Sequence, residues 1–287
     1  MRGIVLIFIV VFAFGFNKKA LLGKELFFDK DLSLNRRVSC ESCHKAKYAG
    51  GDGKRVSVGI KRGYVNSLVL FNSVFNCCYF WNGRRFSLRK AIKDAFFNSY
   101  EMGMTKKLLL KRASKYKTKF IKIYGDFKEE YIYDAIYYFL KELVSLNSKF
   151  DKSLRGEVNL TKSEERVYFL FKKYGCVTCH NGINFGGNSF QKLGVFLDKI
   201  TIPRIEDLAT ITKQKSDIYV YRVPILRNIA KSAPYFHDGS VKSLKKAIIL
   251  MGEWNIGIKI SDKDASDIEA FLKALSGEEP KILKEGK

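Results

Sequence analysis

The chain carries the pentapeptide Cys40-Glu41-Ser42-Cys43-His44, and a second copy follows at Cys176-Val177-Thr178-Cys179-His180. Cys-x-x-Cys-His is the attachment signature of c-type haem. Two thiols one helical turn apart reach the two vinyl groups of one porphyrin, and the next residue turns its imidazole onto the iron. The sequence therefore predicts two covalently bound haems. The expected attachment residues are Cys40, Cys43, Cys176 and Cys179, and the expected proximal ligands are His44 and His180.

Disulfides and a Cys/His zinc site are the alternatives to haem. The two copies of the motif use four of the six cysteines and two of the three histidines. A zinc site would need its ligand pairs closer together in the sequence, and disulfides leave both histidines unexplained. Two haems therefore explain the pattern best.

Length and composition favour two packed domains. A chain of 287 residues forms one large domain or two ordinary ones, and the wide separation of the two motifs favours two. The formal net charge is +23, but lysines and arginines are spread along the whole chain, with no known nucleic-acid-binding module. We expect no nucleic-acid partner, and instead a surface that steers acidic partner proteins.

Residues 1–15 are typical of a secretory signal peptide. Arg2 precedes the apolar run Ile4–Phe14, and the small residues Ala13 and Gly15 suit a cleavage site. The run is short for a membrane-spanning helix, which favours cleavage near Gly15 over an uncleaved N-terminal tether. Export also suits c-type haem, whose thioethers form on the far side of the membrane, so we expect a periplasmic protein.

Apolar periodicity predicts a mostly α-helical protein. The polar segment Asp151–Thr161 indicates a domain boundary, giving an N-terminal haem domain at 16–155 and a C-terminal haem domain at 156–275. Residues 276–287 form a charged tail that we expect to be mobile. The expected helices are Ala20–Asp29, Lys106–Ile123, Glu129–Leu146, Ser163–Tyr174, Leu244–Met251 and Asp262–Leu275.

Six stretches, taken together, resemble the bacterial di-haem cytochrome c peroxidases over nearly the whole chain after the signal segment. They are LGKELFFDKDLSLNRRVSCESCH (22–44), FWNGR (80–84), EMGM (101–104), YGCVTCHNG (174–182), VPILRNIAKSAPYFHDGS (223–240) and the pair Met251-Gly252. The resemblance implies two cytochrome c-like domains with one haem each and a calcium ion near their interface. It also implies that hydrogen peroxide is reduced at the N-terminal haem. Electrons would enter at the C-terminal haem from a small c-type cytochrome or a cupredoxin, and the family commonly forms homodimers.

The resemblance assigns roles to three residues. Met251 matches the second ligand of the C-terminal iron, where a thioether raises the reduction potential; otherwise it is a core methionine. Trp81 matches a tryptophan that couples the two haems, although it also suits a core aromatic position. Glu101 matches the acid that moves a proton between the two peroxide oxygens; without the motif it would be read as a solvated surface residue.

Four further residues carry weaker assignments. Asn66 matches a calcium ligand through its side chain, and Ser232 and Pro234 match positions that bind calcium through backbone carbonyls. His237 is the remaining histidine, and we expect it to be a structural residue or a propionate contact near the C-terminal haem.

The chain also departs from the family. Many members close the resting N-terminal haem with a distal histidine, whereas this chain has no histidine between His44 and His180 and places Ile60 about where that ligand would fall. We expect this haem to be five-coordinate or water-ligated as made, and to need no reductive activation. Met102 and Met104 lie near its pocket.

Two smaller departures concern Ala91 and an adjacent pair of cysteines. Ala91 stands where the family usually offers a glutamine to the distal pocket. Cys77 and Cys78 match no family feature. A disulfide between sequence neighbours is strained, so we expect two buried thiols.

Two other classes of protein share this scaffold. A di-haem electron carrier without catalysis would need neither Glu101 nor an open iron. A protein-modifying di-haem oxidase carries a tyrosine where Met251 stands, which makes this class the weaker alternative.

Overall fold

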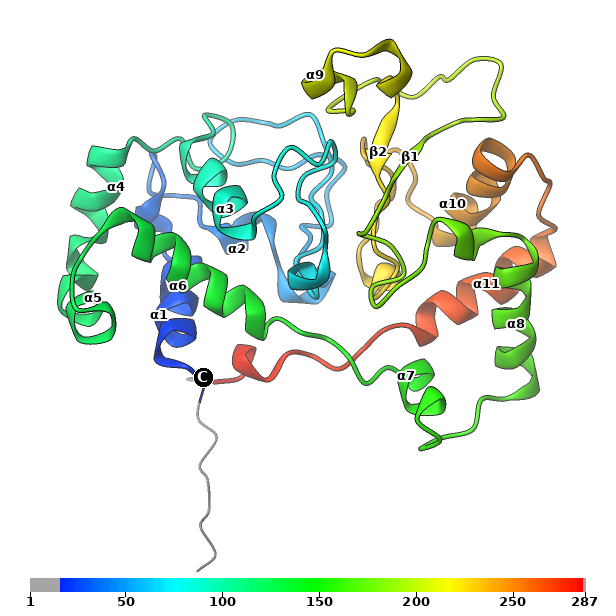
Figure 1. Ribbon diagram of the computed structural model, residues 1–287, viewed down its shortest axis with the longest axis horizontal. Coiled ribbons are helices and arrows are strands. Elements are labelled where there is room, and N and C mark those ends of the chain that lie inside the picture. Colours follow the sequence, from blue (N-terminus) through cyan, green and yellow to red (C-terminus); the bar gives the residue numbers. More distant parts are fainter. Residues whose placement is uncertain (1–15, 286–287) are drawn as a thin grey trace, which may run out of the picture.

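The computed structural model describes residues 16–285, so the predicted signal peptide at 1–15 lies outside it. The described part is mostly helical, as expected, with one antiparallel two-stranded sheet (Figure 1). None of its helices is long and apolar enough to cross a membrane. The helices are α1 (Lys18–Phe28), α2 (Cys40–Cys43), α3 (Leu88–Phe97), α4 (Lys106–Ala113), α5 (Lys117–Tyr124), α6 (Glu129–Glu142), α7 (Lys149–Leu154), α8 (Lys162–Lys173), α9 (Ala209–Thr212), α10 (Leu244–Met251) and α11 (Asp262–Ala274); the strands are β1 (Phe190–Lys192) and β2 (Val220–Arg222).

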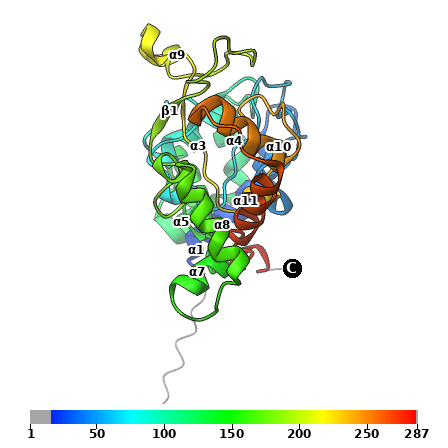
Figure 2. The same ribbon diagram turned by 90° about the vertical axis from the view of Figure 1, so that its right-hand side faces the viewer.

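Two large hydrophobic cores lie at the two ends of the molecule (Figure 1), and a smaller third cluster contains Trp81. The first is built around α1 and α6, which approach closely because Gly23 has no side chain. A Cβ at this position would overlap the Ala135 carbonyl. The second is built from α8, α10 and α11, which lie together in Figure 2. The chain passes from the first core to the second between Leu143 and Phe150. Each core therefore lies beside one Cys-x-x-Cys-His motif.

The predicted helix at Lys106–Ile123 is two helices, and the helix predicted at Glu129–Leu146 ends early. Between α4 and α5 the chain forms a 3₁₀ turn, where the Ser114 hydroxyl donates to the Lys111 carbonyl and competes with helical bonding. Helix α6 ends at Glu142 because Asn72 forms hydrogen bonds with the backbone that follows the helix. The Asn72 amide N–H donates to the Leu143 carbonyl, and the Asn72 side chain accepts from Ser145 N–H at 2.7 Å. A local serine therefore accompanies the break between α4 and α5, whereas a residue distant in sequence sets the end of α6.

The expectation of a mobile tail is wrong for the described residues up to Glu285. Ile282 is fully buried and Leu283 nearly so, and both belong to the first core. The Lys24 ammonium donates to the Ile282 carbonyl at 2.8 Å. Figure 1 shows this C-terminal segment running back from α11 toward the start of α1. The segment therefore ties the end of the chain to the N-terminal half.

A buried ion pair ties the segment between the two cores to the second half. Arg227 donates to both carboxylate oxygens of Asp151, at 2.6 and 2.8 Å, and both side chains are largely buried. The Ser148 hydroxyl also donates to Asp151 at 2.7 Å. Burial opposes charge on Asp151, but the hydrogen bonds from Arg227 and Ser148 hold its pKa below the usual value. The carboxylate is thus fully partnered at neutral pH.

Removing this carboxylate is expected to destabilise the protein strongly. Asp151→Ala leaves the Arg227 guanidinium buried without its partner, which costs about 3–5 kcal/mol in the free energy of unfolding. Denaturant unfolding of the haem-loaded chain, followed by circular dichroism, measures the loss. The matched control is Lys263→Ala, which removes an exposed pair with Asp267 and is expected to cost less than about 1 kcal/mol. Equal effects in the two variants would contradict the importance of the buried pair.

Candidate haem sites and active site

The first motif forms one helical turn that presents its two thiols together. Helix α2 spans Cys40–Cys43, and a capping box joins Ser39 and Ser42 at its start. His44 follows directly, with Nδ1 at 2.8 Å from the Gly50 carbonyl oxygen. A carbonyl only accepts, so Nδ1 carries the proton and Nε2 is left with a free lone pair. This is the tautomer that binds a metal through Nε2.

The second motif has the same chemistry on a different backbone. Cys176–Thr178 forms a 3₁₀ turn after α8, and His180 Nδ1 lies 3.3 Å from the Phe185 carbonyl oxygen. Gly186 has φ +124°, and a Cβ there would meet Pro224 and approach His180 Nδ1 to 3.3 Å. Burial lowers the pKa of His180 to about 4, so the ring is neutral. Both histidines are therefore prepared as neutral ligands.

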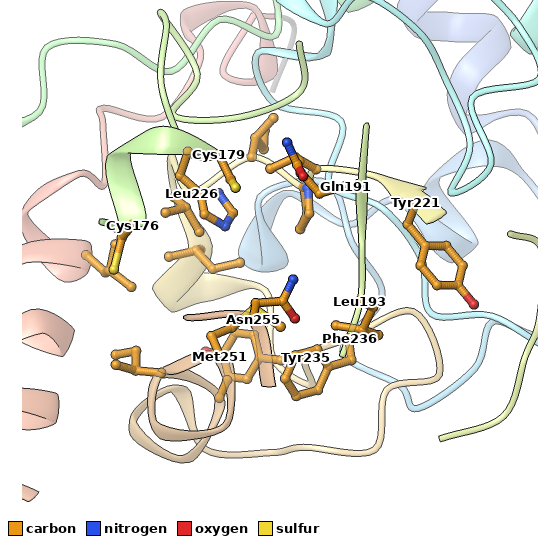
Figure 3. A pocket seen from close by; sticks show the side chains of 18 of the residues that line it. Cys176, Cys179, Gln191, Leu193, Tyr221, Leu226, Tyr235, Phe236, Met251 and Asn255 are labelled. Atoms are coloured by element: carbon orange, nitrogen blue, oxygen red, sulfur yellow. The ribbon is translucent and has the colours of Figure 1, made fainter. Parts of the chain in front are cut away.

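A large cavity adjoins the second motif. Its volume is about 470 Å³, and it is lined by Cys176, Cys179, His180 and Met251 among mostly apolar residues. Met251 is the last residue of α10, and Figure 3 shows it across the cavity from the two cysteines. Two thiols, an imidazole with a free nitrogen, a thioether on the far side and apolar walls fit a c-type haem with His and Met ligands.

Glu101 lies on the side of the molecule that carries the first motif. Its Oε1 accepts a hydrogen bond of 2.7 Å from the Asn98 side chain. Burial is the main reason that the pKa of both the Cys40 and the Cys43 thiol is raised, and the Glu101 charge adds to the shift in each case. Burial raises the pKa of Glu101 itself, partly offset by Arg84 and by the Asn98 hydrogen bond. The structure thus brings the predicted acid near the first haem attachment site.

Ile60 occupies the loop that packs against Glu101. The Ile60 amide donates to the Glu101 carbonyl at 2.9 Å, and Lys61 N–H donates to the Tyr100 carbonyl at 3.2 Å. A Cβ at Gly59 would lie only 2.6 Å from the Glu101 carbonyl oxygen, so only glycine fits there. The side chain at position 60 is aliphatic and cannot bind iron. The loop is therefore fixed beside the acid without offering a ligand.

The third histidine lies at the second motif, whereas two methionines lie near the first. His237, the third histidine, is 2% exposed, and its Nε2 lies 2.7 Å from the Pro203 carbonyl oxygen. It lines the cavity of the second motif, where we expected it. Met102 and Met104 are buried in the first core.

Trp81 lies against Asn66, beside the cavity of the second motif. Its indole nitrogen donates to the Asn66 carbonyl at 2.9 Å, and the ring lines the cavity of the second motif. The neighbouring Ser67 lines the same cavity and donates from its hydroxyl to the Cys43 carbonyl at 2.9 Å. Ser67 also lies 3.4 Å from His44 Nδ1. Ser67 therefore contacts both sites, and Trp81 lies at the second site, hydrogen-bonded to the residue before Ser67.

Comparison with known proteins decides the family. The di-haem cytochrome c peroxidase family matches residues 17–159. The cytochrome c551 peroxidase of Nitrosomonas europaea is 38% identical over 269 residues, covering 91% of this chain and 80% of that protein. The chain belongs to the di-haem cytochrome c peroxidase family. It is therefore a peroxidase with covalently bound c-type haem, as its motifs predict.

Further matches support this assignment. The cytochrome c peroxidase Ccp of Escherichia coli is 39% identical over 91% of this chain, which spans only 58% of that protein. A solved structure, that of a MauG-like protein associated with microbial copper homeostasis, has a TM-score of 0.82 at 27% identity. It covers 92% of this chain, and this chain covers 91% of it. The fold thus extends over both halves of this di-haem peroxidase.

The predicted calcium ligands of this di-haem peroxidase line one cavity. Asn66, Ser232 and Pro234 all border the cavity of the second motif. The Asn66 amide nitrogen donates to the Lys54 carbonyl at 2.7 Å, so its Oδ1 is the atom left for a cation. Within residues 16–285, no cluster of three or more acidic, cysteine or histidine side chains could hold a metal ion. A calcium site built from carbonyl and amide oxygens stays a prediction.

Sequence reasoning missed three features of the di-haem peroxidase. Asn98 was overlooked, although its spacing of three residues from Glu101 was a signal. Tyr221 stacks on His237 at 4.5 Å between ring centroids and lines the cavity. Cys77 is exposed while Cys78 is buried, so the expectation of two buried thiols is wrong for Cys77, which lies at the surface of a loop.

The raised pKa of Glu101 predicts the pH dependence of peroxide reduction. To accept a proton, Glu101 must be ionised, so the rate is expected to fall as the pH drops through its pKa. Burial places this acidic limb above the ordinary value of 4.5. Asn98→Ala removes a hydrogen bond that favours the carboxylate and is expected to move the limb to higher pH. Steady-state rates across pH measure this; an unchanged limb in Asn98→Ala would contradict the assignment.

Proposed function

We propose that this chain reduces hydrogen peroxide to water at its N-terminal haem in the periplasm. Electrons from a small c-type cytochrome or a cupredoxin enter at the C-terminal haem and pass by way of Trp81. One observation carries the proposal: different side chains lie beside the two sites. The second offers Met251, whereas beside the first lie the acid Glu101 and the aliphatic Ile60.

The residues that would hold the two haems are those of the two motifs. Each haem, when bound, supplies an iron that exchanges single electrons and, at an open position, accepts a peroxide oxygen. The N-terminal haem would be held by Cys40, Cys43 and His44, and the C-terminal haem by Cys176, Cys179, His180 and Met251.

Glu101 would handle the proton of the reaction. Splitting peroxide to yield water requires a proton to move from the oxygen nearer the iron to the departing oxygen. A half-buried carboxylate with a raised pKa can take that proton and return it. Asn98 would orient the carboxylate, because its amide donates to Oε1. The backbone bond from Ile60 to Glu101 would hold the loop in place.

Trp81 would couple the two sites. Trp81 is 7% exposed and borders the second cavity, while its indole N–H donates to the backbone of Asn66. The adjoining Ser67 contacts the first motif at the Cys43 carbonyl. Packed aromatic and backbone atoms thus run from one site toward the other.

The remaining assignments are part of the same proposal. We infer two cytochrome c-like domains, 16–155 and 156–275, with one haem each; the two separate cores support this division. Calcium would lie at Asn66, Ser232 and Pro234. Residues 1–15 would direct export, and the family's homodimer is the expected assembly.

Steady-state peroxide reduction, with a reduced small cytochrome as donor, tests the proposal. The oxidised enzyme is used without pre-reduction, and we expect turnover from the first cycle. Because the chain carries a formal net charge of +23, turnover with an acidic donor is expected to slow as salt screens the surface. If both haems take up electrons but no peroxide is consumed, the protein is an electron carrier.

A further inference from the structure

Two adjacent cysteines lie outside both haem motifs, on the loop that leads to Trp81. The Sγ atoms of Cys77 and Cys78 are 3.2 Å apart. Cys77 is exposed, whereas Cys78 has no exposed surface. Cys77 is therefore accessible to an oxidant in solution, whereas the adjoining Cys78 is sheltered.

Backbone hydrogen bonds hold this pair in place. The Cys77 N–H donates to the Gly187 carbonyl at 2.8 Å, which joins the loop to the other half of the protein. The Tyr79 N–H donates to the Arg85 carbonyl at 2.8 Å. These hydrogen bonds fix the loop on both sides of the cysteines. The two sulfurs lie next to each other as free thiols.

Arg222 supplies a buried positive charge beside the pair. Its side chain is 3% exposed, and Nη1 has no hydrogen-bond partner among residues 16–285. Its Nε donates to the Phe80 carbonyl at 3.3 Å, and the guanidinium interacts electrostatically with both thiols. Arg222 also lines the cavity of the second motif, and its charge acts on both sulfurs, so it can stabilise negative charge that develops on them.

The two cysteines differ in reactivity. Burial, together with its neighbour Cys77, raises the pKa of Cys78 to about 12 despite the opposing effect of Arg222. Cys78 therefore stays a thiol. Cys77 is exposed to solvent and lies close to the same guanidinium, so it is the group that reacts first.

We propose that Cys77 and Cys78 form a reversible oxidation site that hydrogen peroxide, the oxidant reduced by this family, converts to a vicinal disulfide. The Cys77 thiolate attacks one peroxide oxygen; an S–O bond forms, the O–O bond breaks, and the departing hydroxide takes up a proton to leave as water. Cys78 then attacks the Cys77 sulfur; the S–O bond breaks, and the released hydroxide leaves as water with the Cys78 proton. Each sulfur loses one electron, and one peroxide becomes two waters.

The resulting bond is expected to be reduced easily. Consecutive Cα atoms are about 3.8 Å apart, whereas disulfides usually span about 4.4–6.8 Å. A strained disulfide has a more oxidising potential and is readily opened by thiols. The site would therefore respond to peroxide and recover when reductant returns. It does not depend on the route that electrons take between the haems.

Peptide mass spectrometry of the haem-loaded full chain tests the proposal. The protein is reduced with a dithiol, freed of reductant without air, and treated with excess hydrogen peroxide in the absence of an electron donor. Free thiols are then alkylated in denaturant. We expect the peptide containing Cys77 and Cys78 to be unalkylated and lighter by two hydrogen atoms, and a mild dithiol to restore both alkylations.

Two variants make the test specific. In Cys78→Ser, peroxide is expected to leave Cys77 as a sulfenic acid that dimedone traps. In Arg222→Gln, disulfide formation is expected to slow several-fold, with Arg222→Lys restoring the rate. The proposal is overturned if peroxide leaves both thiols alkylatable. It is also overturned if Cys77 becomes linked to a second chain, or if both sulfurs pass to irreversible sulfinic or sulfonic acids without a disulfide.

Discussion

Glu101→Gln is expected to lower the rate of peroxide reduction by about 10²–10⁴-fold, the usual contribution of a positioned proton-transfer group. Glutamine has nearly the same size and can still meet the Asn98 amide, which donates to Oε1 at 2.7 Å. It cannot take up or release a proton. The loss should therefore fall on turnover, with little change in haem content or in the free energy of unfolding. Steady-state assays with saturating donor measure it.

The matched control is another glutamate on the same half of the molecule. Glu130 is exposed on α6, and Glu130→Gln is expected to leave turnover unchanged. A rate in Glu101→Gln within about two-fold of the wild type would remove Glu101 from the proton path. A second check is the pH profile: the acidic limb assigned to Glu101 should vanish in the variant.

Met251→His is expected to lower the reduction potential of the C-terminal haem on the order of tenths of a volt, within the span of about 0.8 V that axial ligands set. A thioether favours ferrous iron, and an imidazole favours it less. Met251 ends α10 and borders the second cavity, so histidine at this position points into the same space. A spectroelectrochemical titration measures the shift.

Met102→Leu provides the control for this change. Met102 is buried in the first core, away from the second cavity, so the potential of the C-terminal haem should not move. Donor-dependent turnover should fall in Met251→His, because a donor of fixed potential then reduces this haem less completely. An unchanged potential in Met251→His would show that another group ligates the C-terminal iron.

Local patterns predict the elements on which the site depends. The two Cys-x-x-Cys-His motifs identify the thiols and imidazoles, and Leu244–Met251 is a helix with the bounds that apolar periodicity indicates. These features depend on neighbours within a few positions.

Features set by distant contacts could not be predicted in the same way. Helix α6 ends early because Asn72, far away in the sequence, bonds the backbone around Ser145. The tail is held because Ile282 finds an apolar site in the first core. The sequence of α6 does not indicate its contact with Asn72, and the sequence of the tail does not indicate its contact with the first core. The backbone of Glu101 is likewise held by the distant Ile60 loop.

The spin state of the fully oxidised, haem-loaded protein tests the central claim most directly. The aliphatic side chain of Ile60 offers the N-terminal iron no second ligand, whereas Met251 lines the cavity of the C-terminal site. Absorption and electron paramagnetic resonance spectra should therefore show one high-spin haem and one low-spin haem before any reduction. Two low-spin haems would contradict the claim that this peroxidase is made with one iron open to peroxide.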